Sequence, residues 1–441
     1  MLRSDLYWYK GPIDSDDSED SDSDKRPMYL VQPPVTAAKI QEYIDSGQDI
    51  RATSRNDISF FQLAISKGSV DIVKQLLDKG LDIDKFPIPG CRSPLAHALD
   101  FNKEEIAHLL LDRGANTESI TSVGDDAIQL AVSAGMYNVV LRLIDSSTDF
   151  NVNRANRNGN TLLHLAIIYK RDDLVKLFLD RYDADISFCN DSRETCLHLA
   201  VRAGTIDTIR LFLDKIDINA RDCRGNTCIY NAIKDGSLQV LDLLLKHHAL
   251  PDVLDDDGQT PLGYAITMGL DQHAKMLIDS GALSNVDNIQ LHLRFYITRA
   301  VSRECPSTIT ALIDLGADVN FVDSEGSTLL HNSVRANRTD IAKVLLDRGA
   351  NVNSKLYKTL ETPLHLAVES YCFNPFMIEL LVDNHADIFT RNRDGKSCVN
   401  SDIKKTERDV FVKKGLLLED SSTDEILQRA YDIGVAAKSN T

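Results

Sequence analysis

The sequence predicts an all-α repeat solenoid, in which pairs of helices stack into one elongated array. A segment of 32–35 residues recurs about ten times in the 441-residue chain. Each copy holds a short helical pattern followed by a second helical pattern with a one-sided apolar stripe. One such pair cannot bury its apolar face alone, whereas stacked pairs bury both faces, at roughly 1.5–3 kcal/mol per large apolar side chain.

The residue that opens the first helix of each repeat can be followed along the chain. In most repeats it is Thr or Ser, whose hydroxyl caps the first helical turn. Pro is tolerated at the next position, as at Pro94 and Pro261, because no N–H is needed there. The opening residues are Ser59, Ser93, Asp126, Thr161, Thr195, Thr227, Thr260, Phe295, Thr328 and Thr362, and Ser397 opens a fragment.

The remaining positions of each repeat support the same helix pair. A small residue five places after the opening residue, such as Ala166, lets neighbouring helices approach closely. The second helix carries apolar pairs four residues apart, as in Leu174-Val175 and Phe178-Leu179. A glycine such as Gly114 ends it, because a left-handed C-terminal position costs glycine nothing.

Two repeats read GNTLLHLAIIYKRDDLVKLFLDRYDADI, from Gly159, and GSTLLHNSVRANRTDIAKVLLDRGANVN, from Gly326. With ETPLHLAVES from Glu361, they resemble the ankyrin repeat, which starts its first helix with TPLHxA and ends near LLxxGADVN. The resemblance covers residues 35 to about 400. It implies antiparallel helix pairs joined by β-hairpin fingers and curved into a concave binding surface.

We expect four segments along the chain. Residues 1–30 form a disordered acidic tail that contains IDSDDSEDSDSD, residues 31–54 form a capping half-repeat, and residues 55–390 hold about ten repeats. Residues 391–441 contain an incomplete repeat, a capping helix around 421–434 and a frayed end. The repeat at 287–320 has lost its TPLH motif but keeps Ala300, and it is retained as a repeat.

Composition excludes several classes of function. The net charge of −17 argues against binding of nucleic acid or anionic lipid. The sequence has no apolar run long enough to indicate membrane insertion, and its N-terminus lacks the apolar core of a secretory signal. The eight cysteines are too sparse for a disulfide scaffold, so we expect reduced thiols and a cytoplasmic or nuclear location. The chain is expected to be monomeric and to need no cofactor.

Two recurring side-chain types could suggest metal sites. The four histidines lie at one motif position, where the resemblance implies a hydrogen bond to the adjoining hairpin backbone: His164, His198, His331 and His365. Cys196 and Cys228 lie at one position in neighbouring repeats, so stacking holds them about 10 Å apart. Zinc ligands must converge on one point, so we expect these two, with Cys189 and Cys223, to be buried apolar residues and no metal to bind. No nucleophile-and-base motif or phosphate loop indicates an enzyme.

The resemblance places partner contacts on the fingers and on the exposed C-terminal half of each first helix. In the middle repeats these positions are basic, and the next finger is acidic. The expected contact residues are Arg154, Arg157, Tyr169, Lys170, Arg193, Arg202, Arg221, Arg224 and Lys234, beside Asp252, Asp255, Asp256 and Asp257. Such a surface is either a set of solvated charges or a docking site for an acidic or mixed-charge segment of a protein.

Two kinds of modification are candidates. Acidic residues follow each serine of the tail, a pattern that resembles acidophilic-kinase sites, at Ser15, Ser18, Ser21 and Ser23. The phosphorylated tail either folds back on the basic residues or serves only for solubility or targeting. Asn219 and Asn320 follow Leu by eight places and Asp by two, which resembles an asparaginyl-hydroxylase pattern, although structural reasons also explain them.

The favoured function is therefore a protein-binding scaffold or adaptor that uses the concave face and is regulated through its acidic tail. Three alternatives stay open: an inhibitor of a transcription factor or signalling protein, a substrate-recognition subunit of a ubiquitin ligase, and a membrane-skeleton linker.

Overall fold

The computed structural model describes residues 37–47, 50, 59–84, 93–118, 125–284, 289–369, 374–399 and 405–415. The chain divides into two compact units, an N-terminal unit, Met1–Thr148, and a C-terminal unit, Asp149–Thr441. The serine candidates in the tail and the helix expected around 421–434 lie outside the described residues.

The N-terminal unit is built from helix pairs preceded by a single helix. Its helices are α1 (Ala37–Asp45), α2 (Phe60–Lys67), α3 (Val70–Asp78), α4 (Pro94–Asp100), α5 (Glu104–Asp112), α6 (Ala127–Ala134) and α7 (Tyr137–Ser146). The first helices of the pairs, α2, α4 and α6, stack on one another, and so do the second helices, α3, α5 and α7. Helix α1 packs against both α2 and α3.

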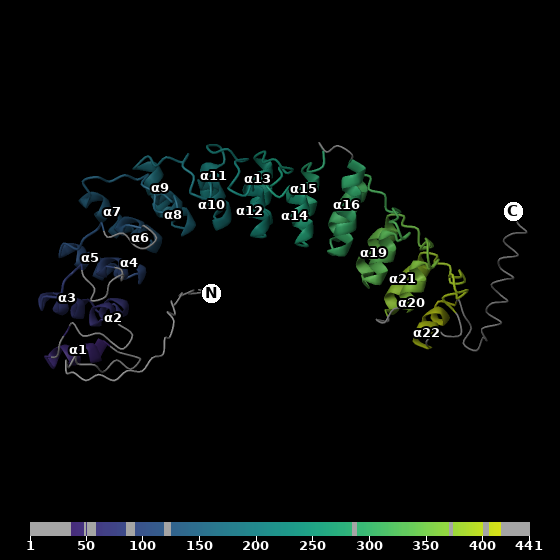
Figure 1. Ribbon diagram of the computed structural model, residues 1–441, viewed down its shortest axis with the longest axis horizontal. Coiled ribbons are helices and arrows are strands. Elements are labelled where there is room, and N and C mark those ends of the chain that lie inside the picture. The colour runs from purple at the N-terminus through teal and green to yellow at the C-terminus, as the bar shows by residue number, and fades with distance from the viewer. Residues whose placement is uncertain are drawn as a thin grey trace, which may run out of the picture. The chain divides into compact units, whose positions relative to one another are not determined.

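The C-terminal unit continues the pattern with seven helix pairs and a last described helix. Its first helices are α8 (Leu162–Ile168), α10 (Cys196–Ala203), α12 (Cys228–Lys234), α14 (Pro261–Thr267), α16 (Ile289–Ser302), α18 (Leu329–Arg335) and α20 (Pro363–Glu369). Its second helices are α9 (Asp172–Asp180), α11 (Ile206–Phe212), α13 (Leu238–Lys246), α15 (Asp271–Asp279), α17 (Pro306–Asp314), α19 (Thr339–Asp347) and α21 (Pro375–Asp383). The first helices lie side by side in one row, and α22 (Lys405–Lys413) packs against α21 (Figure 1). The all-helical repeat solenoid expected from the sequence is confirmed.

The recurring histidines have a structural role. In α18, His331 Nδ1 accepts a hydrogen bond from the backbone N–H of Thr328 at 3.2 Å, and Nε2 lies 3.3 Å from the carbonyl oxygen of Glu361 in the next finger. His164, His198 and His365 repeat this arrangement. In α2 and α6 a glutamine occupies the same position and completes the cap. The histidines therefore join each helix start to the following finger, as expected.

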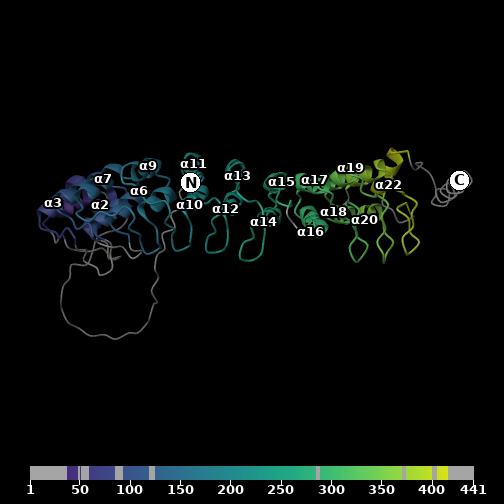
Figure 2. The same cartoon turned by 90° about the horizontal axis from the view of Figure 1, so that it is seen from above.

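Hairpin fingers connect the helix pairs and are joined to one another through their backbones. Asp191 N–H donates to Asn158 O at 3.0 Å, Cys223 N–H donates to Ser192 O at 2.8 Å, and Asp256 N–H donates to Arg224 O at 3.0 Å. Figure 2 shows the fingers of the C-terminal unit extending to the same side of the helices. Because these fingers bind one another, the spacing of their backbones is fixed.

At some finger positions the next finger approaches so closely that only glycine fits without a steric clash. A Cβ at Gly159 would lie 2.6 Å from the backbone nitrogen of Asp191, whereas a Cβ at Gly258 would meet nothing within 4 Å. Both residues have positive φ. We expect Gly258→Ala to lower the free energy of unfolding by about 1 kcal/mol and Gly159→Ala by about 2–3 kcal/mol, since only the latter also forces fingers apart. Equal losses in urea unfolding would contradict this.

Helix α16 departs from the other first helices. It has 14 residues, where α12 and α14 have 7 each. It begins at Ile289, six residues before Phe295, so Phe295 lies inside the helix and does not open it. The expectation that Phe295 marks the helix start is therefore wrong. The hydroxyl of Tyr296 lies 2.8 Å from Thr260 Oγ1. The Tyr296 ring lies beside Gly263, at the position where α8 and α10 carry a histidine.

The six cysteines within the described ranges divide into two environments. Cys196, Cys228, Cys305 and Cys398 are buried, whereas Cys189 and Cys223 are exposed. The expectation that all four middle-repeat cysteines are buried is therefore wrong, because Cys189 and Cys223 belong to fingers and not to helices. Within the described ranges, no helix has the length and apolar character needed to cross a membrane.

Candidate functional site

The expected contact residues of the middle repeats lie at two levels of the C-terminal unit. Arg157, Arg193, Arg221, Arg224 and the aspartates 255–257 are on consecutive fingers, and Tyr169, Lys170, Arg202 and Lys234 are at the ends of consecutive first helices. All of these are exposed except Asp255, which is half-buried; of the remaining expected residues, Arg154 is exposed and Asp252 is half-buried.

Tyr169, Lys170, Arg202, Lys234 and Asp235 form what we call the helix-end cluster. Burial raises the pKa of the Asp235 carboxyl, and the positive charges of Arg202, Lys170 and Lys234 oppose that shift. Cations from three successive repeats therefore act on one carboxylate. Even when the Glu194 carboxylate paired with Arg202 is counted, these side chains carry three positive and two negative charges, so their sum at the ends of α8, α10 and α12 is positive.

Arg202 is held in place by its own finger. Its guanidinium binds the carboxylate of Glu194, which is buried and also accepts a hydrogen bond from Asn190 Nδ2 at 2.9 Å. A buried carboxylate is stable when it is paired and hydrogen-bonded. The Arg202 guanidinium is therefore held in a fixed position, and the Glu194 carboxylate compensates much of its charge.

The basic and acidic fingers are linked at their boundary. Arg221 Nη2 lies 3.0 Å from Asp256 Oδ1 on the next finger. Asp255 Oδ1 accepts hydrogen bonds from the N–H groups of Asp257 and Gln259, at 3.1 and 2.8 Å, and so stabilises its own turn. Asp257 is exposed at the turn.

Four of the expected cations make no ion pair within the described part of the chain: Lys170, Arg193, Arg224 and Lys234. They are exposed and belong to consecutive repeats. They are the residues best suited to meet carboxylates of another molecule.

Arg193 also stands out by its backbone. Its φ of 56° lies in the left-handed region, at the position where the neighbouring fingers have Gly159, Gly225 and Gly258. Replacing it by Gly should raise the free energy of unfolding by about 1 kcal/mol, since only Gly adopts this conformation without steric cost. Arg224→Gly, in the next finger and without positive φ, should give no gain in a urea melt. An equal gain at both positions would show that strain at Arg193 is not the cause.

Asn219 and Asn320, the hydroxylation candidates, tie each repeat to the next. Asn219 Oδ1 accepts a hydrogen bond from Leu250 N–H at 2.8 Å, and Asn320 Oδ1 accepts one from Asn351 N–H at 2.7 Å. Asn153 and Asn353 make the same contact. This structural role accounts for the recurring asparagine, and hydroxylation stays a prediction.

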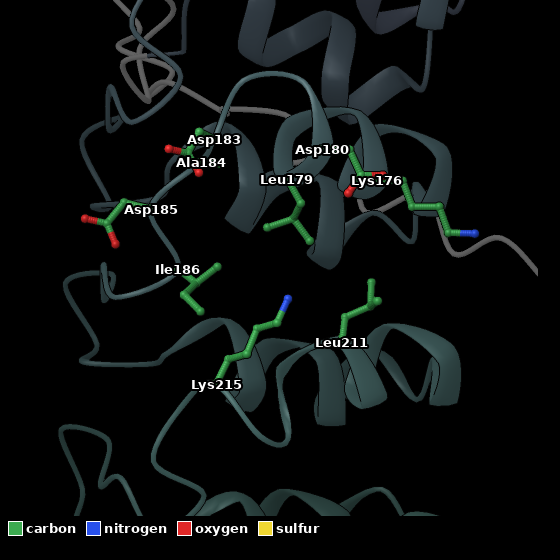
Figure 3. Close-up of a pocket in the computed structure, with 9 residues that line it drawn as sticks. All are labelled: Lys176, Leu179, Asp180, Asp183, Ala184, Asp185, Ile186, Leu211 and Lys215. Atoms are coloured by element: carbon green, nitrogen blue, oxygen red, sulfur yellow. The ribbon is translucent and has the colours of Figure 1, made fainter.

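A groove between second-helix regions was missed by sequence reasoning. It has a volume of about 640 Å³ and lies between α9 and α11. Leu179 from α9 and Leu211 and Lys215 from the facing segment point toward one another across it (Figure 3). The other lining residues are Lys176, Asp180, Asp183, Ala184, Asp185 and Ile186. A sequence signal existed, because the repeat that starts at Thr195 has 32 residues, fewer than its neighbours, and α11 is correspondingly short.

No cluster of three or more His, Cys, Asp or Glu side chains suited to a metal ion occurs among the residues that the structure describes. The middle repeats instead combine exposed cations, an exposed tyrosine and fixed backbone geometry. That combination is suited to binding a surface.

Comparison with known proteins agrees with this arrangement. A family model described as ankyrin repeats (3 copies) matches residues 35–122, 128–222, 197–288 and 297–392. An ankyrin repeat protein of Acanthamoeba polyphaga mimivirus is 24% identical over 286 residues, which is 64% of this chain and 33% of the relative. The B-cell lymphoma 3 protein homolog of Mus musculus is 31% identical over 114 residues, or 25% of each chain.

A third relative matches over a longer stretch. The transient receptor potential cation channel subfamily A member 1 of Homo sapiens is 23% identical over 369 residues, which is 79% of this chain and 29% of that protein. The chain thus spans between a quarter and a third of the length of these relatives. The similarity is one of repeat architecture over a part of each relative.

Proposed function

The chain belongs to the ankyrin-repeat family, and we propose that it is a scaffold or adaptor that binds a protein partner along the fingers and first helices of its C-terminal unit. Ankyrin repeats generally mediate protein–protein interaction and are generally not enzymes. The observation that carries the proposal is the set of exposed cations Lys170, Arg193, Arg224 and Lys234, which make no ion pair with any residue that the structure describes.

The positive charge of these four side chains favours an acidic or mixed-charge segment as the partner. Arg193 and Arg224 lie on fingers whose backbones are hydrogen-bonded in series, so their spacing is set before a partner arrives. Arg202 and Tyr169 supply a fixed guanidinium and an aromatic surface, the residue types that most often dominate binding. Complementary charge mainly determines partner choice and association rate.

A matched pair of variants tests the proposal. The first carries Lys170→Glu, Arg193→Glu, Arg224→Glu and Lys234→Glu. The control carries Lys176→Glu, Arg210→Glu, Lys215→Glu and Lys343→Glu, which changes the net charge equally at exposed positions outside the first helices and fingers. Partners captured from native lysate by the wild type are identified by mass spectrometry, and circular dichroism checks that both variants fold.

The purified partner is then titrated against all three proteins at several salt concentrations. We expect the first variant to bind about tenfold more weakly or worse, which is about 1.4 kcal/mol, and the control to stay within about twofold of the wild type. Equal loss in both variants would indicate a net-charge effect. No loss in either would place binding elsewhere.

Regulation of this module by modification is part of the same proposal. Phosphate on Ser15, Ser18, Ser21 or Ser23 would add about −1.5 to −2 charges per site to an already acidic segment. Peptide mapping of the native protein tests both this and hydroxylation of Asn219 and Asn320. Unmodified peptides at all six positions would remove the regulatory part and leave the binding surface untouched.

A further inference from the structure

Helix α16 takes up space that a finger occupies in the neighbouring repeats. Nine residues, 280–288, separate α15 from α16, whereas fourteen residues, 247–260, separate α13 from α14. The missing length is replaced by additional turns at the N-terminus of α16, which lies in the first-helix row (Figure 1). A continuous helical surface is therefore presented where the other repeats present a hairpin.

The added turns expose large apolar side chains. Leu291 is 66% exposed and Phe295 is 54% exposed, and they are four residues apart, so they share one face of the helix. The opposite face buries Leu293, Tyr296 and Ile297. The packing of the repeat thus buries one face of α16 and leaves Leu291 and Phe295 exposed to solvent.

The charged side chains that α16 itself carries are all positive. Helix α16 contains no Asp or Glu. The guanidinium of Arg294 lies 3.1 Å from the centroid of the Phe321 ring, and Nη2 donates to Val322 O at 3.2 Å. The Arg299 guanidinium lies 5.7 Å from the centroid of the Phe295 ring.

These arginines are held by aromatic rings and not by carboxylates. Neither makes an ion pair with any residue in the described ranges. Stacking on a ring face orients a guanidinium without using up its in-plane N–H donors. Two arginines next to an apolar pair therefore offer hydrogen-bond donors suited to carboxylates.

We propose that one face of α16, formed by the exposed Leu291, Arg294 and Phe295 and the half-buried Arg299, is a second docking site, which takes a short acidic protein segment carrying a large apolar side chain. The apolar side chain covers Leu291 and Phe295, and flanking Asp or Glu residues bind the two arginines. An anionic lipid surface fits less well, because a membrane requires a broad positive surface, whereas this chain has a net charge of −17 and α16 offers only two arginines. This site uses none of the four cations of the proposed partner surface.

The probe is a displayed library of random 12-residue peptides, selected on the immobilised full-length chain. The variant is Leu291→Ser/Phe295→Ser. The control is Leu250→Ser/Phe376→Ser, which removes the same number of apolar side chains, 49% and 71% exposed, elsewhere in the C-terminal unit. Thermal unfolding followed by circular dichroism checks that both proteins fold like the wild type.

We expect the wild type and the control to enrich peptides with Phe, Leu, Met or Trp beside Asp or Glu. A fluorescent copy of an enriched peptide should bind the Leu291→Ser/Phe295→Ser variant about tenfold more weakly, and the control within about twofold. Arg299→Gln should weaken binding and reduce its salt dependence. The four-residue charge reversal of the partner surface should leave binding unchanged, which separates failure of this site from failure of the proposed function.

Several results would overturn the proposal. They are enrichment of neutral or basic peptides, no enrichment, and equal binding to the Leu291→Ser/Phe295→Ser variant. Binding to phosphatidylserine vesicles without peptide enrichment would also overturn it, in favour of a membrane surface.

Discussion

Lowering the pH from 6.5 to about 4 should remove roughly 3 kcal/mol from the free energy of unfolding through His331 alone. Burial lowers the pKa of His331 from 6.5 to about 4 and lowers the pKa of His164 and His198 in the same direction. Between these pH values the unfolded chain binds protons that the folded chain does not. Stability is therefore complete above pH 6.5 and falls as the pH decreases toward the folded pKa.

The hydrogen bonds explain why the folded protein resists protonation. His331 Nδ1 accepts from the Thr328 N–H, so Nε2 carries the proton and donates to Glu361 O. A second proton on Nδ1 would point at the Thr328 N–H, from which Nδ1 accepts a hydrogen bond in the neutral ring. The cap of α18 and its contact with the next finger would then be weakened together.

His331→Gln tests this cause directly. Gln62 and Gln129 cap α2 and α6 from the same position, so the variant should fold and should lose less stability between pH 6.5 and 4.5 in urea unfolding. The control is His385→Asn, at an exposed histidine with φ of 67°, a conformation that Asn tolerates. It should keep the pH dependence of the wild type. A slope unchanged by His331→Gln would assign acid sensitivity to other groups.

The sequence predicted this part of the fold well, because each signal was local. A Thr followed three residues later by His is both a helix cap and a tie to the next finger, and the repeat spacing locates every copy. Where the local signal was lost, the prediction failed. Phe295 was placed at a helix start, yet the helix begins at Ile289, and this repeat lacks the TPLH motif that marks the start elsewhere. Tyr296 of α16 instead reaches Thr260, whose own helix α14 has Gly263 at the histidine position.

The candidate surface was less predictable, because its charges are paired across repeats. Arg221 and Asp256 are 35 residues apart and meet only because their fingers stack. Arg202, by contrast, pairs within its own repeat, with Glu194 eight residues earlier and directly before the N-cap of α10. Sequence indicates which positions are exposed and charged, whereas stacking decides which of those charges are already compensated.

Phe411→Ala should have the largest effect of any single substitution considered, a loss of about 3–5 kcal/mol in the stability of the C-terminal helices. Phe411 is fully buried in α22 and belongs to one core cluster with Ile378 and Leu381 of α21. Truncating it leaves a cavity and uncovers the apolar face of α21. In a repeat array each helix pair is stabilised mainly by its neighbours, so the loss should be concentrated in α20 and α21.

Hydrogen exchange read by mass spectrometry, together with urea unfolding, can locate that loss. The control Lys413→Ala removes the exposed ion pair with Glu379, 2.8 Å long, and should cost less than about 1 kcal/mol. Faster exchange confined to α20, α21 and α22 in Phe411→Ala would show that α22 closes the array. Exchange as slow as in the wild type would mean that α21 is stable without it, and that the array ends one helix earlier.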